Sequence, residues 1–125
     1  MPTLTNYLGT GNSAATAQAS LGFLSNSLTA TGSTQGTALA LPSDFSVFKT
    51  VAASTGAILP ASSTQVNPTD VYFVVNYGAN ALTVYPPTGG NVANGSTNAG
   101  FSVAANKMAT FVSLGGGAWA ASVSA

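Results

Sequence analysis

The chain has 125 residues, of which 46% are hydrophobic, and only 3% are charged, against about a quarter in a typical soluble domain. This length and hydrophobic content favour one domain with its own core, and the absence of cysteine excludes disulfides, thiol nucleophiles and thiolate metal sites. A net charge of zero leaves no basic patch for nucleic acid, and no stretch reaches the length of about 18 apolar residues that spans a membrane, so we expect neither partner.

The N-terminal residues 1–12 are mostly polar and are interrupted by proline and glycine, so we expect an extended arm there. The following stretch, SAATAQASLGFLSNSL (13–28), carries alanine and leucine at helical spacing. Asn12 or Ser13 could cap its start, and Gly22 weakens its second half. The pattern predicts one short helix near residues 13–24.

From residue 34 onward the pattern changes to short strands separated by turns. The predicted strands are TALAL (37–41), FSVFKTV (45–51), GAILP (56–60), VYFVVN (71–76), ALTVY (81–85), FSVAA (101–105), MATFVSL (108–114) and AWAASV (118–123). Strands of this number and spacing predict an all-β, mainly antiparallel fold, a compact sandwich or barrel of about seven or eight strands. We expect it to form a single domain over residues 13–125.

The strand VYFVVN (71–76) is a nearly continuous apolar run, which is typical of a strand buried on both faces. The turn residues YGAN (77–80) follow it, and Gly78 and Asn80 tolerate positive φ, so we expect a hairpin that pairs 71–76 with 81–85. Pro86 and Pro87 cannot donate a ladder hydrogen bond and should end that pairing.

Alternation predicts which side chains share a face. Phe45 and Val47 should face one side of their strand and Phe48 the other. In the strand 108–114, one face carries Met108, Thr110, Val112 and Leu114, and the other carries Ala109, Phe111 and Ser113. Trp119 is expected near the edge of the core.

The side chains that could perform chemistry are few. The four charged residues are Asp44, Lys49, Asp70 and Lys107, and there is no histidine. Each aspartate follows a turn, where a carboxylate more often accepts backbone hydrogen bonds than acts as a catalytic acid. Without histidine the usual serine triad cannot form, so we expect no enzyme activity, no catalytic residue, no metal site and no cofactor.

The aromatic side chains leave a sugar-binding alternative open. Tyr72, Tyr77, Tyr85 and Trp119, with many asparagines and threonines, could form a neutral stacking site. Aromatic side chains in strands usually serve packing, and we favour that interpretation.

Three segments resemble a small β-rich module of tailed-bacteriophage virion proteins: VVNYGANALTVYPPTGG (74–90), FSVAANKMATFV (101–112) and GGAWAA (116–121). The resemblance covers about residues 34–123 and marks a structural module rather than a reaction. It implies a capsid decoration (cement) protein on the outer surface of the phage head, which stabilises contacts between neighbouring capsomers. The implied partners are the major capsid protein and copies of the chain itself, as a homotrimer.

The hypothesis of a decoration protein assigns two sets of contact residues, and one alternative function stays open. The arm is expected to touch the capsid through Pro2, Thr3, Leu4, Thr5, Tyr7 and Leu8, because an extended segment can add a strand to a neighbour's edge. Contacts with a neighbouring copy are expected at Tyr85, Pro86, Pro87, Asn91 and Asn94. The alternative is a receptor-binding or glycan-binding module of a tail or head fibre.

Overall fold

The computed structural model describes residues 24–61 and 66–125, and every regular element within these residues is a β-strand. The strands are β1 (Leu24–Thr29), β2 (Leu39–Ala40), β3 (Phe45–Thr50), β4 (Gly56–Ile58), β5 (Val71–Asn76), β6 (Leu82–Tyr85), β7 (Asn91–Val92), β8 (Phe101–Val103), β9 (Lys107–Gly115) and β10 (Ala118–Val123). The predicted all-β class is confirmed, and each predicted strand overlaps one of these, whereas β1 and β7 were not predicted as strands.

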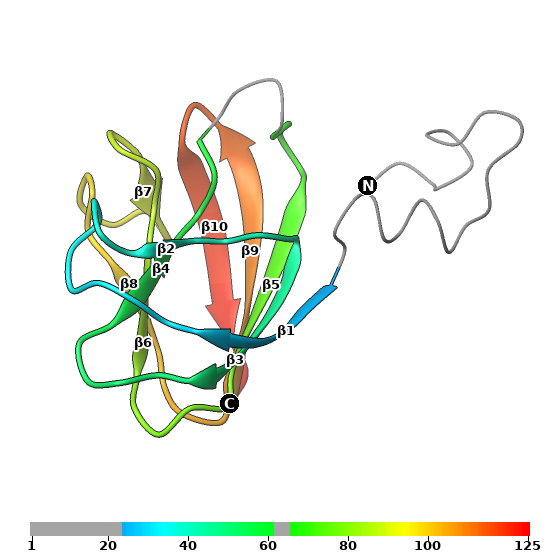
Figure 1. The fold of residues 1–125 in the computed structure, drawn as a ribbon. Coiled ribbons are helices and arrows are strands. Elements are labelled where there is room, and N and C mark those ends of the chain that lie inside the picture. The colour runs from blue at the N-terminus through cyan, green and yellow to red at the C-terminus, as the bar shows by residue number, and fades with distance from the viewer. Residues whose placement is uncertain (1–23, 62–65) are drawn as a thin grey trace, which may run out of the picture.

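The strands form two sheets that pack against each other as a sandwich (Figure 1). The larger sheet has the order β1-β3-β5-β9-β10-β7, and the smaller has the order β2-β4-β6-β8. Side chains from both sheets meet in one core. Phe101 of β8 and Phe111 of β9, for example, pack edge to face with their ring centroids 5.7 Å apart.

The sheets are mixed, so the prediction of a mainly antiparallel fold is wrong. From β1 to β9 the chain crosses to the other sheet after every strand, which places β1-β3-β5 and β2-β4-β6 as parallel neighbours. A chain that winds around the core in this way returns to each sheet in the same direction as before. Antiparallel pairing appears only where β6 meets β8 and where β9 meets β5 and β10 among the described strands.

The predicted hairpin between residues 71–76 and 81–85 is also wrong, because β5 lies in the larger sheet and β6 in the smaller. The intervening residues turn a corner between the sheets, and the buried side chain of Asn76 holds that corner. Its Nδ2 donates to the carbonyl oxygens of Asn80 and Val103, and its Oδ1 accepts from the backbone N–H of Gly78. The predicted turn residues 77–80 therefore connect the two sheets and do not join two paired strands of one sheet.

The predicted arm over residues 1–12 and the predicted helix near residues 13–24 lie outside the described residues, apart from Leu24. The candidate stretch 13–28 extends into the described residues, and no helix is found there, because residues 24–28 belong to β1. Ser27, with a φ of 76°, interrupts the register of β1 with β3, so Leu24 and Leu28 face opposite sides of the sheet.

The core follows the predicted alternation. Phe48 of β3 and Phe111 of β9 are fully buried between the sheets, and the residues on either side of Phe111 point the other way. Trp119 is 1% exposed and lies well inside the core, not at its edge, and its ring meets Tyr72 edge to face at 5.5 Å. One face of the larger sheet therefore packs on the core, and its other face points away from it.

A candidate interaction surface on the six-stranded sheet

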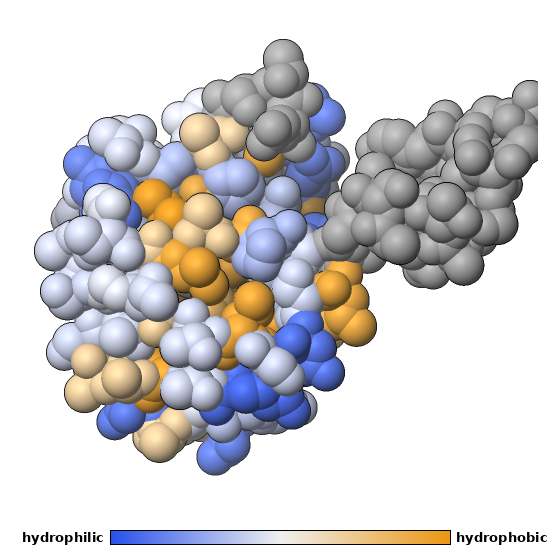
Figure 2. Space-filling view, viewed as in Figure 1, coloured by the Kyte–Doolittle hydropathy of each residue, from blue (hydrophilic) through white to orange (hydrophobic). Residues whose placement is uncertain are grey.

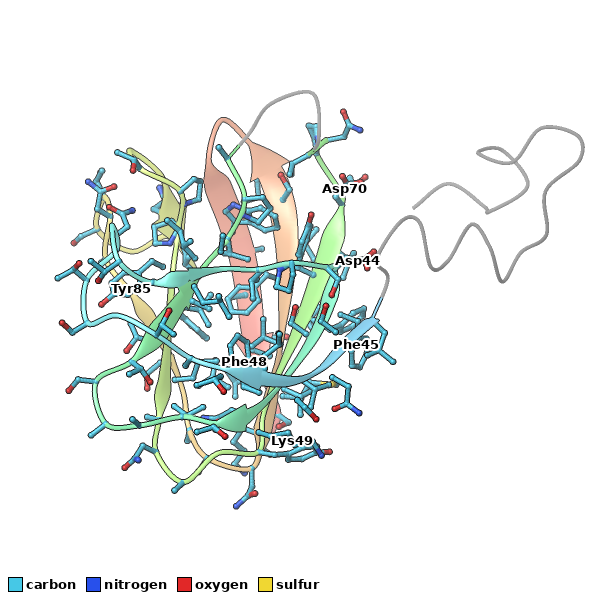
Figure 3. The ribbon with its side chains drawn as sticks, in the orientation of Figure 1. Asp44, Phe45, Phe48, Lys49, Asp70 and Tyr85 are labelled. Atoms are coloured by element: carbon cyan, nitrogen blue, oxygen red, sulfur yellow. The ribbon has the colours of Figure 1, made fainter. Side chains whose placement is uncertain are left out.

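The side of the larger sheet that faces away from the core is unusually apolar. Because Phe48, Val74, Phe111 and Trp119 point into the core, strand alternation turns their neighbours outward. The large apolar residues of the resulting outer face are Leu24, Phe45, Val47, Val71, Phe73, Val75, Tyr77, Met108, Val112 and Leu114, and Lys49 and Thr110 share the face with them. Figure 3 shows the contrast within β3, where Phe48 lies between the sheets and Phe45 points away from them.

Exposed hydrophobic side chains concentrate on this outer face. Of the five large hydrophobic residues exposed in the described part of the chain, four belong to it: Leu24 (62% exposed), Tyr77 (56%), Met108 (39%) and Leu114 (61%). Single exposed leucines are ordinary on protein surfaces, but a contiguous group on one sheet face is typical of a contact surface.

Cross-strand pairing brings the outer face together in rows. One row runs from Leu24 through Phe45 and Phe73, whose ring centroids are 5.4 Å apart, to Thr110. In the adjacent row Val47 and Val75 are paired, and both are buried although no second layer covers them in the described structure. Their larger neighbours on the same face shield them, so the surface is packed rather than a set of separate side chains.

Among the described residues, Lys49 is the only charged side chain on the outer face, and it lies at one corner. Its Nζ sits over the ring of Tyr77, 5.2 Å from the centroid, in a cation–π arrangement. The ring thereby partly satisfies the ammonium group without an acidic partner. Lys107 belongs to the end of β9 instead, where its Nζ donates to the carbonyl oxygen of Ala125.

The two aspartates lie at one end of the larger sheet, just before β3 and β5, which are parallel neighbours (Figure 3). The side chain of Asp70 accepts a hydrogen bond from the backbone N–H of Asn67, in agreement with the predicted turn role. Burial raises the pKa of Asp44 above its ordinary value, a hydrogen bond with its own backbone opposes that rise, and the charge of Asp70 adds to it. Burial also raises the pKa of the nearby Tyr72, and both carboxylates add to the effect.

The predicted neighbour-contact residues surround the loop after β6. Tyr85 is half-buried and its hydroxyl donates to the carbonyl oxygen of Ser33, and both following prolines are buried. Asn91 lies in β7 beside β10, and Asn94 is exposed with a φ of 57°. Of this set Asn94 alone offers a largely free side chain, and the contact itself stays a prediction. The predicted capsid-contact residues of the arm lie outside the described residues.

The neutral loop over residues 86–100 is held by hydrogen bonds within the loop and to Gln35. Asn98 Oδ1 accepts from the backbone N–H of Gly89 and from Nε2 of Gln35, and the same Nε2 donates to the carbonyl oxygen of Pro86. Pro86 and Pro87 follow directly after the last residue of β6, as predicted. The loop is therefore folded onto the domain through hydrogen bonds, without ion pairs between its described residues.

The aromatic residues considered for a sugar site are not gathered on one surface. Tyr72 and Trp119 pack against each other inside the domain, Tyr85 lies in the other sheet, and Tyr77 is exposed on the outer face. Within residues 24–61 and 66–125, no three histidine, cysteine or acidic side chains come together as a metal site would require.

A second apolar area is visible at the edge of the sandwich. Figure 2 looks onto the side formed by β1 and β2 and shows orange side chains in its middle, surrounded by pale and blue ones. Leu28 of β1, Leu39 of β2 and Leu41, which follows β2, are half-buried and pack against the core. This area is the margin of the core and is distinct from the outer face.

The outer face could have been found in part from the sequence. The apolar run of β5 predicted a strand buried on both faces, and alternation placed Met108, Val112 and Leu114 together. Nothing in the sequence indicated that β3, β5 and β9 are neighbours, so the patch could not be assembled from its pieces.

No helix within the described residues is both long enough and apolar enough to cross a membrane. Comparisons with known protein families, with curated proteins and with solved structures each found no match for this chain.

Proposed function

We propose that this protein is a structural component of a bacteriophage particle, a decoration protein that binds the outer surface of the head and stabilises contacts between neighbouring capsomers. The observation that carries the proposal is the outer face: a packed apolar sheet surface with Lys49 as its only charged side chain among the described residues. Apolar surfaces of this kind favour lasting contact with another protein over a free existence in solution.

The composition supports the same role. With two basic and two acidic side chains in the whole chain, contacts can form without removing many charges from water, which is costly when the charges stay unpaired. A protein with zero net charge also has little electrostatic repulsion between copies. Both properties suit dense packing on a shell.

The sequence resemblance to a phage virion module adds a third line of support and names the partners: the major capsid protein and further copies of the chain. The arm at Pro2, Thr3, Leu4, Thr5, Tyr7 and Leu8 is the proposed capsid contact. We propose no catalytic step for this protein.

Binding of the purified protein to undecorated capsids tests this proposal. We expect saturable binding whose Kd changes by less than about tenfold between low and high salt, because few ion pairs can contribute. Deletion of residues 1–10 should weaken binding if the arm makes the contact. Absence of capsid binding, or a steep loss of affinity with salt, would contradict the proposal, and unchanged affinity after the deletion would remove the arm from it.

A further inference from the structure

We propose that the outer face of the larger sheet is where two copies of this chain meet, sheet against sheet. The inference rests on the proposed role as an assembled structural protein, but it is tested on the purified chain alone. Failure of dimerisation would leave capsid binding open, and failure of capsid binding would leave dimerisation open.

The first argument comes from β5. Val71, Phe73 and Val75 make its outward side as apolar as its inward side, and such strands are normally covered on both faces. In the described structure the core covers the inward side only. The sequence of β5 therefore fits a strand with a second layer, and we infer that a second copy of the chain supplies it.

The second argument concerns charge. A second copy brings the same nearly uncharged surface, with one lysine at a corner that already rests on its own Tyr77. The described outer face carries no acidic side chain that would pair with a basic group, so its charge does not indicate a partner of opposite charge. Two copies related by a twofold axis would bring apolar rows together without burying an unpaired charge at the centre.

The third argument is the size of the outer face. Four adjacent strands about 4.8 Å apart, each roughly 20 Å long, give a footprint on the order of 400 Å² per copy in projection. Side-chain relief increases the accessible area, which puts the contact at the lower end of specific interfaces. We therefore expect a dimer, in place of the homotrimer that the resemblance implies, with a Kd on the order of micromolar. Dimerisation becomes more complete where copies are concentrated on a surface.

A charge-insertion pair tests the contact. Met108→Lys with Leu114→Lys places two charges on exposed positions of the outer face, so the monomer does not have to bury them. The matched control is Thr97→Lys with Ser102→Lys, which adds the same charge at exposed positions off the larger sheet. Sedimentation equilibrium should show a dimer for the wild type and the control, and at least about a hundredfold weaker association for the outer-face variant.

A second measurement keeps the inference testable if the charged variant folds poorly. The chain contains no cysteine, so a single spin label can be attached at Thr110→Cys, which is paired with Phe73 at the middle of the outer face. The control label is Ser102→Cys on the opposite sheet. Sheets packed about 10 Å apart should place the Thr110 labels close together and the Ser102 labels about 30 Å apart or more.

Four results would overturn the inference. A wild-type chain that stays monomeric to about 1 mM lies far outside the association expected from the area. Equal weakening by the outer-face and control lysines would show a general charge effect. If the wild type is monomeric and the outer-face variant loses capsid binding, this surface belongs to the capsid contact instead. If deletion of residues 1–23 makes the chain dimerise, the surface belongs to the chain's own N-terminal segment.

Discussion

Replacement of Asn76 by alanine should destabilise the domain more than most surface or loop substitutions. Asn76 is fully buried at the corner where the chain leaves β5 for the other sheet. Its side chain joins the corner to β8, because Nδ2 donates to the carbonyl oxygen of Asn80 at 2.8 Å and to that of Val103 at 2.9 Å. Its Oδ1 accepts from the N–H of Gly78 at 2.9 Å.

The magnitude follows from the groups left without partners. A buried donor or acceptor without a partner costs about 1–3 kcal/mol, and two of the three hydrogen bonds are buried, so we expect a loss of about 3–5 kcal/mol in the free energy of unfolding. A domain of this size is stable by about 5–15 kcal/mol, so the loss is a large share of the total. It corresponds to a fall of about 10–20 °C in Tm.

Urea and thermal unfolding followed by circular dichroism would measure this effect. The matched control is Asn80→Ala, which removes one partly buried hydrogen bond from Nδ2 to the carbonyl oxygen of Val51 and should cost about 1 kcal/mol. A loss below about 1 kcal/mol for Asn76→Ala, or equal losses for the two variants, would refute the reasoning that Asn76 holds the corner.

Three further predictions concern titration and packing. Asp44→Asn should raise Tm at pH 7, because burial raises the pKa of Asp44 and thus makes its ionised form unfavourable in the folded state. The gain in Tm should shrink as the pH falls through this raised pKa toward 3.8, and a gain that grows in acid would contradict the reasoning. Spectrophotometric titration should find one tyrosine above the ordinary pKa of 10.0 that is missing in Tyr72→Phe. Gly78→Ala should cost about 1–3 kcal/mol, because its Cβ would lie 2.6 Å from Cβ of Val51, whereas Gly36→Ala, with nothing within 4 Å, should be nearly neutral.

The strands themselves were predictable because their signal is local. The runs that form β5, β9 and β10 have the alternation or continuous apolarity of strands, and Gly115–117 supplied the turn that joins β9 to β10. Local patterns also gave the correct faces of β9. These features depend on side chains within a few residues of each other.

The sheet partners were not predictable, because they depend on contacts between distant parts of the chain. The turn residues after Asn76 suit a hairpin as well as a crossing between the sheets. The crossing is stabilised by a hydrogen bond from Asn76 to Val103, 27 residues away. The parallel order of β1, β3 and β5 follows from such crossings. The outer face depends on this order, because its side chains come from strands that are far apart in the sequence and neighbours only in the sheet.

The strand β1 was not predicted, and the reason is related. Leu24 and Leu28 are four residues apart, which fits a helix, and a regular strand would put both on one face. The irregularity at Ser27 separates them, so Leu28 packs toward the core while Leu24 joins the outer face. No local sequence pattern indicates a bulge of this kind in a stretch of serine, asparagine and leucine.

The most direct test of the central claim is a cryo-EM map of the intact particle that carries this protein. We predict density for the sandwich repeated over the capsid lattice, with outer faces of neighbouring copies in contact and the N-terminal segment against the major capsid protein. Density confined to a few copies at a tail or fibre would contradict a decoration role and favour the receptor-binding alternative.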